Sequence, residues 1–433
     1  MDQGWMRAGA VAVDITPPVG AELCGFLARV QPSIEVHDRL AVRALYLETD
    51  DARLLWLHAD LIGLEHGFVR DLRVELADRL GLAATEVVVS ATHTHSGPAT
   101  IHLICCGDYD GAYVAWLRDR MLEAAGQAVE RREPVRMVRG EGSCDLATDR
   151  RGKPSAHRDS VLGVIGWRRR DDSWLAVLVN YPIHHVALRG DNRAISADMA
   201  GRAAKSIADA LGGQPVALVT NGACGNLNPP ATRSDFIQRG PVLPRFDLME
   251  QWGDQIAREA LAALQRAEVD LPVVSSVASP FMLRFEPWGR ERMTQEAERL
   301  LMAMANETGY VADRYREAIG RWRSLMLDRS TADSAASETV LEVQVVRLGG
   351  ARLVCLAAEV FSLMGEALRR VAGASLYVVG YANGDVGYLA PSSAYDEGGY
   401  EIDSAFAFYG GLPACRGEFE RLRDHVAGLL KND

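Results

Sequence analysis

The sequence predicts an α/β fold: a layered domain in which mixed β-sheets are flanked by helices. Two observations predict this class. Short apolar runs rich in strand-forming residues alternate along the chain with longer segments of helical periodicity. Several of these runs lack polar alternation, which is typical of strands buried on both faces. Residues of chemical interest lie between His93 and Tyr388, so we expect the 433 residues to form a single domain, 1–433.

The expected elements follow one another in order. Strands are expected at Ala41–Leu47, Leu54–His58, Glu86–Ser90, Trp174–Tyr181, Val216–Thr220, Leu341–Val346, Leu353–Ala357 and Leu376–Gly380. Helices are expected at about Gly67–Leu80, Tyr113–Val129, Met199–Leu211, Asp247–Ala267 and Phe361–Val371. The stretch at about 287–330 is rich in Arg, Glu, Ala and Leu at helical spacing, which predicts a helical insertion on the surface.

Composition and charge exclude several functional classes. A net charge of −11, without a concentrated basic stripe, argues against a nucleic-acid partner. The seven cysteines include no CxxC motif, which indicates reduced thiols in a cytosol instead of a disulfide framework. No signal peptide is recognisable, and no apolar run reaches the ~18 residues of a membrane span. We therefore expect a cytoplasmic protein that acts on a small molecule, with a homo-oligomer left open.

Residues of ligand type follow several of the expected strands. They are His93, His95, His184, Glu359 and the loop of residues 221–230. Sites in α/β sheets gather beyond the carboxyl ends of strands, so we expect these segments to converge. In extended backbone, His93 and His95 direct both imidazoles to one face, which suits a metal ligand beside a second catalytic histidine. His184 and His185 are adjacent, so at most one reaches the same site, and the residues alone favour neither.

Two further segments are candidates, each with a simpler alternative. Glu359 stands where a strand passes into a helix, and helix N-terminal N–H groups favour a carboxylate there, with or without a metal. Asn221–Pro230 is a loop of small and amide residues, which is compatible both with an anion-binding nest and with a plain tight turn.

These motifs together resemble those of the neutral/alkaline (non-lysosomal) ceramidase family. The resemblance begins at residues 9–20, with the sequence GAVAVDITPPVG, and continues through residues 36–38, 59–60 and 90–98. It extends to residues 180–184, 195–198 and 221–230, then to Glu359 and Tyr388, so it covers nearly the whole chain. The resemblance implies the fold of the neutral ceramidase catalytic domain.

The resemblance also implies one zinc ion per chain, held by two histidines, a glutamate and a tyrosine. Matched by motif, the ligands are His93, His184, Glu359 and Tyr388, which selects His184 over its neighbour. His95 becomes the catalytic histidine of the same motif. Tyrosine coordinates zinc as a phenolate, a form that a nearby dication favours.

The chain departs from the family pattern at three points. Asn228, in the segment Gly225-Asn-Leu-Asn228-Pro229, stands where family ceramidases carry a catalytic serine, and an amide is no nucleophile. The chain ends soon after Tyr388, so no C-terminal immunoglobulin-like domain is expected. Family ceramidases are exported or membrane-associated, whereas no export signal is visible here. We therefore expect a divergent cytoplasmic member whose substrate is not ceramide.

The predicted activity is zinc-dependent hydrolysis of an amide bond in a small or medium polar substrate. Zinc lowers the pKa of a bound water to about 7 and polarises the carbonyl. His95 is expected to assist proton transfer, and Asn228 to donate to the oxyanion. Arg150, Gly225 and Asn226 are expected to bind the substrate. Two alternatives stay open: a zinc-dependent esterase or lactonase, and a zinc lyase or isomerase of a small polar metabolite.

Overall fold

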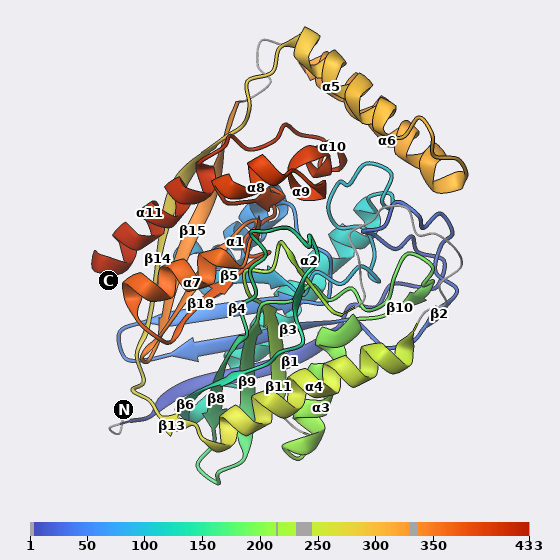
Figure 1. The fold of residues 1–433 in the computed structure, drawn as a ribbon. Helices are drawn as coiled ribbons and strands as arrows, with labels where there is room; N and C mark the ends of the chain where they lie inside the picture. Colours follow the sequence, from blue (N-terminus) through green and yellow to red (C-terminus); the bar gives the residue numbers. More distant parts are fainter. Residues whose placement is uncertain (1–3, 214, 231–244, 330–336, 433) are drawn as a thin grey trace.

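The computed structural model describes residues 4–213, 215–230, 245–329 and 337–432 (Figure 1). Within these residues the largest element is a mixed sheet of nine strands, ordered β11-β9-β8-β6-β1-β3-β4-β5, with β13 paired to β6. The strands are β1 (Met6–Asp14), β3 (Ala41–Glu48), β4 (Arg53–Ala59), β5 (Val87–Ala91), β6 (Glu133–Ser143), β8 (Val161–Arg168), β9 (Trp174–Tyr181), β11 (Val216–Asn221) and β13 (Glu268–Val269). The β4–β5 and β9–β11 pairs are parallel, and the other pairs are antiparallel.

A second sheet of four strands lies in the C-terminal part of the described chain. It consists of β14 (Val274–Arg284), β15 (Glu338–Leu348), β16 (Ala351–Leu356) and β18 (Leu376–Val379) in that order. Three short pairs tie loops together: β2 (Glu35–Val36) with β10 (Ala194–Ile195), β7 (Thr148–Asp149) with β12 (Leu227–Asn228), and β17 (Glu359–Val360) with β19 (Tyr388–Leu389).

Helices cover the outer faces of both sheets. On the large sheet, α1 (His66–Leu80) and α2 (Gly111–Glu130) cover the β1–β3–β4–β5 half, and α3 (Asp198–Ala210) and α4 (Phe246–Gln265) cover the β6–β8–β9–β11 half. On the small sheet, α7 (Leu363–Ala372) and α11 (Glu418–Asn432) form the outer layer. Short helices α8 (Ser392–Glu397), α9 (Tyr400–Asp403) and α10 (Ala405–Phe408) precede α11.

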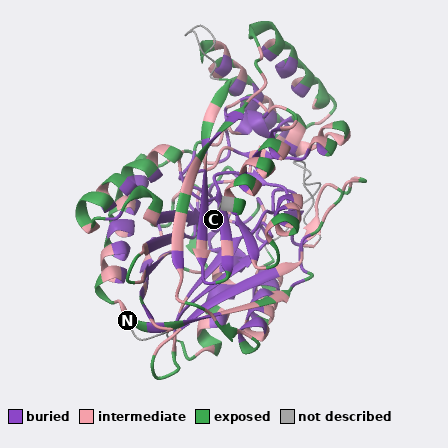
Figure 2. Ribbon diagram, turned by 90° about the vertical axis from the view of Figure 1, so that its left-hand side faces the viewer, coloured by how far each residue is buried: buried purple, intermediate pink, exposed green. Residues whose placement is uncertain are grey.

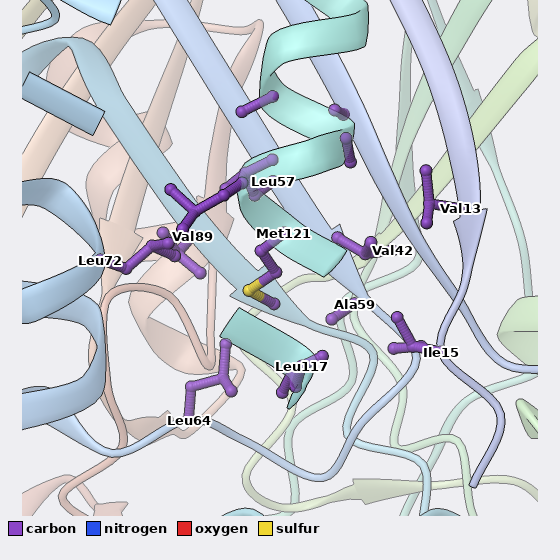
Figure 3. Packing of buried hydrophobic residues seen from close by; sticks show 14 of the residues in the cluster. Val13, Ile15, Val42, Leu57, Ala59, Leu64, Leu72, Val89, Leu117 and Met121 are labelled. Atoms are coloured by element: carbon purple, nitrogen blue, oxygen red, sulfur yellow. The ribbon is translucent and has the colours of Figure 1, made fainter. Parts of the chain in front are cut away.

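The two sheets pack face to face between these helical layers, and strand β4 shows why. Leu57 and Met121 of α2 belong to the cluster that Figure 3 shows, whereas Trp56, the neighbour of Leu57, belongs to the cluster between the sheets. Leu353 of the small sheet joins that same inter-sheet cluster. Because successive side chains of a strand point to opposite faces, an apolar run without polar alternation fills both layers. The central strands are accordingly buried in Figure 2.

The predicted fold class is confirmed as a large mixed sheet flanked by helices. Every predicted strand and helix is present, with ends shifted by at most three residues. The elements that were not predicted are the longer strands β1, β6, β8 and β14, the two-residue strands, and the helices after β19. Strand β6 illustrates the reason, because it contains Gly140, where an added Cβ would lie 2.5 Å from the carbonyl oxygen of Ala263. Its low strand propensity reflects the close approach of α4, which only packing reveals.

Helices α5 (Arg290–Ala303) and α6 (Tyr310–Arg329) occupy the stretch predicted as a helical insertion. They pack on each other and project away from the sheets in Figure 1. Arg314 donates to the carbonyl of Cys105 at 3.0 Å, and Tyr315 packs edge-on against Phe408 of α10. The assignment of the chain to a single domain stays a prediction. Of the helices in the described ranges, none combines the length and apolar character that crossing a bilayer requires.

Candidate metal centre

The segments that follow β5, β9, β11 and β16 meet where the two sheets come together. Hydrogen bonds between the sheets fix this meeting: Asn180 donates from Nδ2 to the carbonyl of Val378 at 2.9 Å, and the N–H of Asn383 donates to the carbonyl of Val89 at 2.6 Å. The convergence expected from the sequence therefore occurs, and the surrounding apolar clusters keep it away from water.

Three side chains form a compact buried group. Nε2 of His184 lies 2.9 Å from Oε2 of Glu359, and Nε2 of His93 lies 3.5 Å from the same oxygen. The three potential ligand atoms lie within 4.8 Å of one another, and the residues are at most 2% exposed. A carboxylate buried to this degree needs positive charge or several donors beside it. The group is therefore able to hold a metal ion.

The imidazole orientations fit a metal. Nδ1 of His93 donates to the carbonyl of Ile62 at 2.6 Å. Nδ1 of His184 is shared between the carbonyls of Cys224 at 2.8 Å and Leu227 at 3.0 Å. A carbonyl accepts only from a protonated nitrogen, so in the neutral rings both Nε2 atoms carry lone pairs directed at Glu359. Two imidazole nitrogens held in this way, with one carboxylate oxygen, match the ligand chemistry of divalent metals such as zinc.

The three side chains of the group differ in the direction of their pKa shifts. Burial lowers the pKa of His93 to about 4, which keeps this ring neutral. Burial also lowers the pKa of His184, but Cys224 and Glu359 outweigh it and raise the pKa to about 9. Burial raises the pKa of Glu359, but the two imidazoles outweigh it and hold the pKa well below the usual range. Without a metal, a proton on His184 thus balances the carboxylate charge.

Glu359 is placed by a strand and not by a helix. It begins β17, whereas α7 starts only at Leu363, so the helix N-terminal setting expected from the sequence is corrected. Its carboxylate interacts with side chains: besides His184, the hydroxyl of Tyr381 donates to Oε2 at 3.1 Å, and the hydroxyl of Tyr409 donates to Oε1.

His95 lies beside His93, for a reason other than the one predicted. The two Nε2 atoms are 3.1 Å apart. However, β5 ends at Ala91 and His93 has a left-handed φ of 58°, so the extended alternation expected here is wrong and a sharp turn directs the rings together. The His95 ring lies against Gly25, where an added Cβ would be 2.4 Å from Nδ1. Arg29 donates to the His95 carbonyl at 2.6 Å and fixes the turn.

Arg150 connects two other predicted site residues, Tyr388 and Asn228, to the buried acid Glu401. Its guanidinium donates to the hydroxyl of Tyr388 at 3.0 Å, to Oδ1 of Asn228 at 3.2 Å and to Glu401 at 2.8 Å. Tyr388 pairs with Glu359 in the parallel β17–β19 register, which places it next to the metal group. Its predicted role as a metal ligand, like the catalytic role of Asn228, stays a prediction.

Two tyrosines of the group were missed from the sequence. Tyr381 stacks on His93 with ring centroids 3.9 Å apart, and its hydroxyl lies 3.2 Å from Nε2 of His184. It has a φ of 52°, which is rare for a bulky residue. Tyr381 directly follows the Leu376–Gly380 run, so the strand-end rule that selected the other residues applies to it. Tyr409 follows α10, and no local pattern indicates it.

Gly225 and Asn226, predicted to bind substrate, interact with the protein's own loops. The N–H of Gly225 donates to the carbonyl of Val360 at 2.8 Å. Asn226 donates from Nδ2 to Asp149 at 2.6 Å and accepts at Oδ1 from the N–H of Ser362 at 2.8 Å. These contacts hold the 221–230 loop against β17. The described geometry thus assigns both residues to positioning the site, and contact with a substrate stays untested.

Comparison with known proteins agrees with this architecture. Residues 6–221 match the family described as "Neutral/alkaline non-lysosomal ceramidase, N-terminal". A crystal structure of a neutral ceramidase from Pseudomonas aeruginosa shares the fold, with 19% identity, a TM-score of 0.74, and coverage of 100% of this chain and 75% of that chain. A structure described as "Ceramidase complexed with C2" has 18% identity, a TM-score of 0.75, and coverage of 100% and 76%. No curated protein matches the sequence.

Proposed function

Because the chain belongs, through residues 6–221, to the neutral/alkaline non-lysosomal ceramidase family, we propose that it is a zinc-dependent hydrolase of an amide bond. The proposed substrate is a small or medium polar molecule and not ceramide, because Asn228 stands where the family ceramidases carry their catalytic serine and serine chemistry is therefore not available. The observation that carries the proposal is the buried His93–His184–Glu359 group, whose two Nε2 atoms face Oε2 of the carboxylate.

Zinc suits this donor set of two nitrogens and one oxygen. When bound, it supplies a Lewis acid that polarises a substrate carbonyl and lowers the pKa of water. His93, His184 and Glu359 would hold it, with one ion per chain. Tyr388 is the fourth ligand in this proposal, because it is paired with Glu359. Burial raises the pKa of Tyr388 well above its usual value and Arg150 only partly opposes this, so the phenolate depends on the charge of the bound metal.

In this proposal the surrounding side chains transfer a proton and stabilise the charge that develops on the substrate. His95 is fixed through Gly25 and Arg29, and its pKa lies well below the usual value because the ring is buried beside His93. A neutral imidazole at this position takes or returns a proton at the reacting carbonyl. Arg150 fixes the amide of Asn228, which donates a hydrogen bond to the developing oxyanion.

The protein's setting is part of the proposal. The seven cysteines are free thiols in the structure, which suits the reducing cytoplasm. The partner is a small-molecule substrate, and both a nucleic-acid partner and a membrane span are excluded from the proposal. Fractionation of the native cells tests the location.

Metal analysis of the purified protein is the deciding experiment. Wild type should carry about one zinc per chain, and His93→Ala and Glu359→Ala should lose it. His425→Ala is the matched control, because His425 interacts with Ser279 and not with the group. A folded wild type that takes up no zinc, even when zinc is supplied, contradicts the proposal.

Substrate screening then separates the bond types. Panels of amides, esters and lactones, each assayed with and without chelator, distinguish an amidohydrolase from an esterase or lactonase. Reaction in water enriched in heavy oxygen separates hydrolysis from an isomerase or from a lyase that does not add water, since hydrolysis must incorporate solvent oxygen into the product. If a chelator does not affect hydrolysis of the amide, the metal has no part in the mechanism.

A further inference from the structure

Behind Glu359 lies a second carboxyl group, that of the half-buried Asp385. Asp385 stands in the loop between β18 and β19, and its Oδ1 accepts a hydrogen bond from the N–H of Gly387 at 2.9 Å. Its Oδ2 lies 3.3 Å from the hydroxyl of Tyr409, the same hydroxyl that donates to Oε1 of Glu359. One phenol thus stands between two carboxyl groups.

Tyr409 has a single hydroxyl proton but two carboxyl groups within reach of its hydroxyl oxygen. A phenol has one proton, and the closer contact, to Oε1 of Glu359, takes it. The hydroxyl oxygen of Tyr409 therefore presents a lone pair to Oδ2 of Asp385. An ionised Asp385 would place two electron-rich oxygens against each other, whereas a protonated Asp385 donates to that lone pair. The hydrogen-bond pattern is complete only with the acid form.

The surroundings of Asp385 favour the same form. Asp385 is half-buried, and the partial loss of solvent together with repulsion from Glu359 and Glu65 raises the pKa of its carboxyl group well above the usual value. The cavity of about 260 Å³ on which it lies also contains Glu401 and Arg329. Glu401 is paired with Arg150 and Arg151, and Arg329 donates to the carbonyl of Gly410. No described ion pair or hydrogen bond joins Asp385 to a cationic side chain.

We propose that Asp385 is a positioning residue that retains its proton and donates it to Tyr409, which directs the single proton of Tyr409 to Oε1 of Glu359. Oε1 is thereby occupied, and Oε2 alone stays available between the two imidazoles. Glu359 then offers a metal one oxygen with a fixed orientation. This inference rests on the proposed metal function, because it concerns how the same glutamate is presented to the ion.

Replacing Asp385 by asparagine tests whether its side chain acts as a hydrogen-bond donor to Tyr409 or as an ionised carboxylate. Asp385→Asn keeps a donor toward Tyr409, whereas Asp385→Ala removes it. Zinc affinity is measured by competition with a chelator of known strength. Asp385→Ala and Tyr409→Phe should weaken zinc binding about 10–100-fold, and Asp385→Asn should stay within about 3-fold of wild type. Tyr395→Phe, a tyrosine of the same cavity whose hydroxyl donates to the Ala414 carbonyl, should bind zinc like wild type.

Equal losses in Asp385→Asn and Asp385→Ala overturn the inference, and so does full affinity in both. Infrared spectroscopy of the metal-free protein gives an independent readout, even where a variant folds poorly. Wild type near neutral pH should show the C=O stretch of a protonated carboxyl group that is missing from Asp385→Asn. A wild type without that band overturns the inference, whereas a wild type that has the band but takes up no zinc overturns only the proposed function.

Discussion

Nε2 of His184 lies 2.9 Å from Oε2 of Glu359, although His184 follows β9 of the large sheet, Glu359 follows β16 of the small sheet, and the two are 175 positions apart in the chain. Nδ1 of the same ring is held by the carbonyls of the 221–230 loop. The imidazole is therefore fixed at both ends, by backbone on one side and by the carboxylate on the other. A group positioned in this way needs little rearrangement to bind an ion.

Zinc binding is expected to release protons. The pKa of His184 is raised to about 9, whereas that of His93 is lowered to about 4. Of the two histidines, only His184 is therefore protonated on both ring nitrogens at pH 7 without metal. Binding at pH 7 should release about two protons per zinc, one from His184 and one from the phenol of Tyr388, and affinity should therefore rise with pH. Calorimetry in buffers of different ionisation enthalpy measures this number; no release at pH 7 contradicts it.

The stability of the metal-free protein should follow from the same two pKa values. The raised pKa of His184 adds stability that is fully present below pH ~6.5 and is lost as pH rises through about 9. The lowered pKa of His93 removes stability as pH falls from ~6.5 toward 4. Denaturant titrations of His184→Ala and wild type between pH 6 and 10 should therefore converge at the alkaline end. A constant difference between them would refute the assignment.

Gly25→Ala should impair catalysis without removing the metal. The added Cβ would lie 2.4 Å from the His95 ring, which must move. We expect kcat to fall by about 10²-fold or more, with zinc content unchanged. Gly20→Ala is the matched control, because Gly20 has a φ of 103° against 106° for Gly25, and a Cβ there meets nothing within 4 Å. Equal losses in both variants would indicate backbone strain instead of a displaced His95.

Tyr388→Phe should remove the proposed fourth ligand. Zinc added to wild type should produce the ultraviolet difference spectrum of a phenolate, and this signal should disappear in Tyr388→Phe. Tyr381→Phe should keep it, since Tyr381 serves in the proposal as a hydrogen-bond donor to Glu359. Loss of the signal in Tyr381→Phe alone would assign the ligand to that residue.

Asn228→Ala should leave a weak enzyme. Loss of one oxyanion donor typically lowers kcat by ~10²–10³-fold, with metal content retained. Thr148→Val is the control, because Thr148 contacts the backbone of Asn228 through its hydroxyl and not the amide. Wild-type kcat in Asn228→Ala would exclude the amide from the oxyanion site.

Local pattern was sufficient to predict most of the longer strands and helices and to indicate His93 and Glu359 as candidates, whereas the choice of His184 over His185 came from the family resemblance. The run Glu86–Ser90 is apolar throughout, as a strand buried on both faces requires, and the structure has β5 there. His93, His184 and Glu359 each follow such a strand, and the structure brings them together. Strands whose sequence is adapted to a neighbouring helix, such as β6 at Gly140, lack that pattern and were missed.

By itself the sequence determined where the buried strands run and which polar residues follow their ends, because burial imposes a chemical pattern on consecutive residues. Only the tertiary structure decided which polar groups meet. The left-handed turn at His93, the carbonyls that hold both Nδ1 atoms, and the Asp385–Tyr409 pair behind Glu359 all depend on contacts between distant segments. Such contacts follow from the packing of the two sheets, which no local sequence window contains.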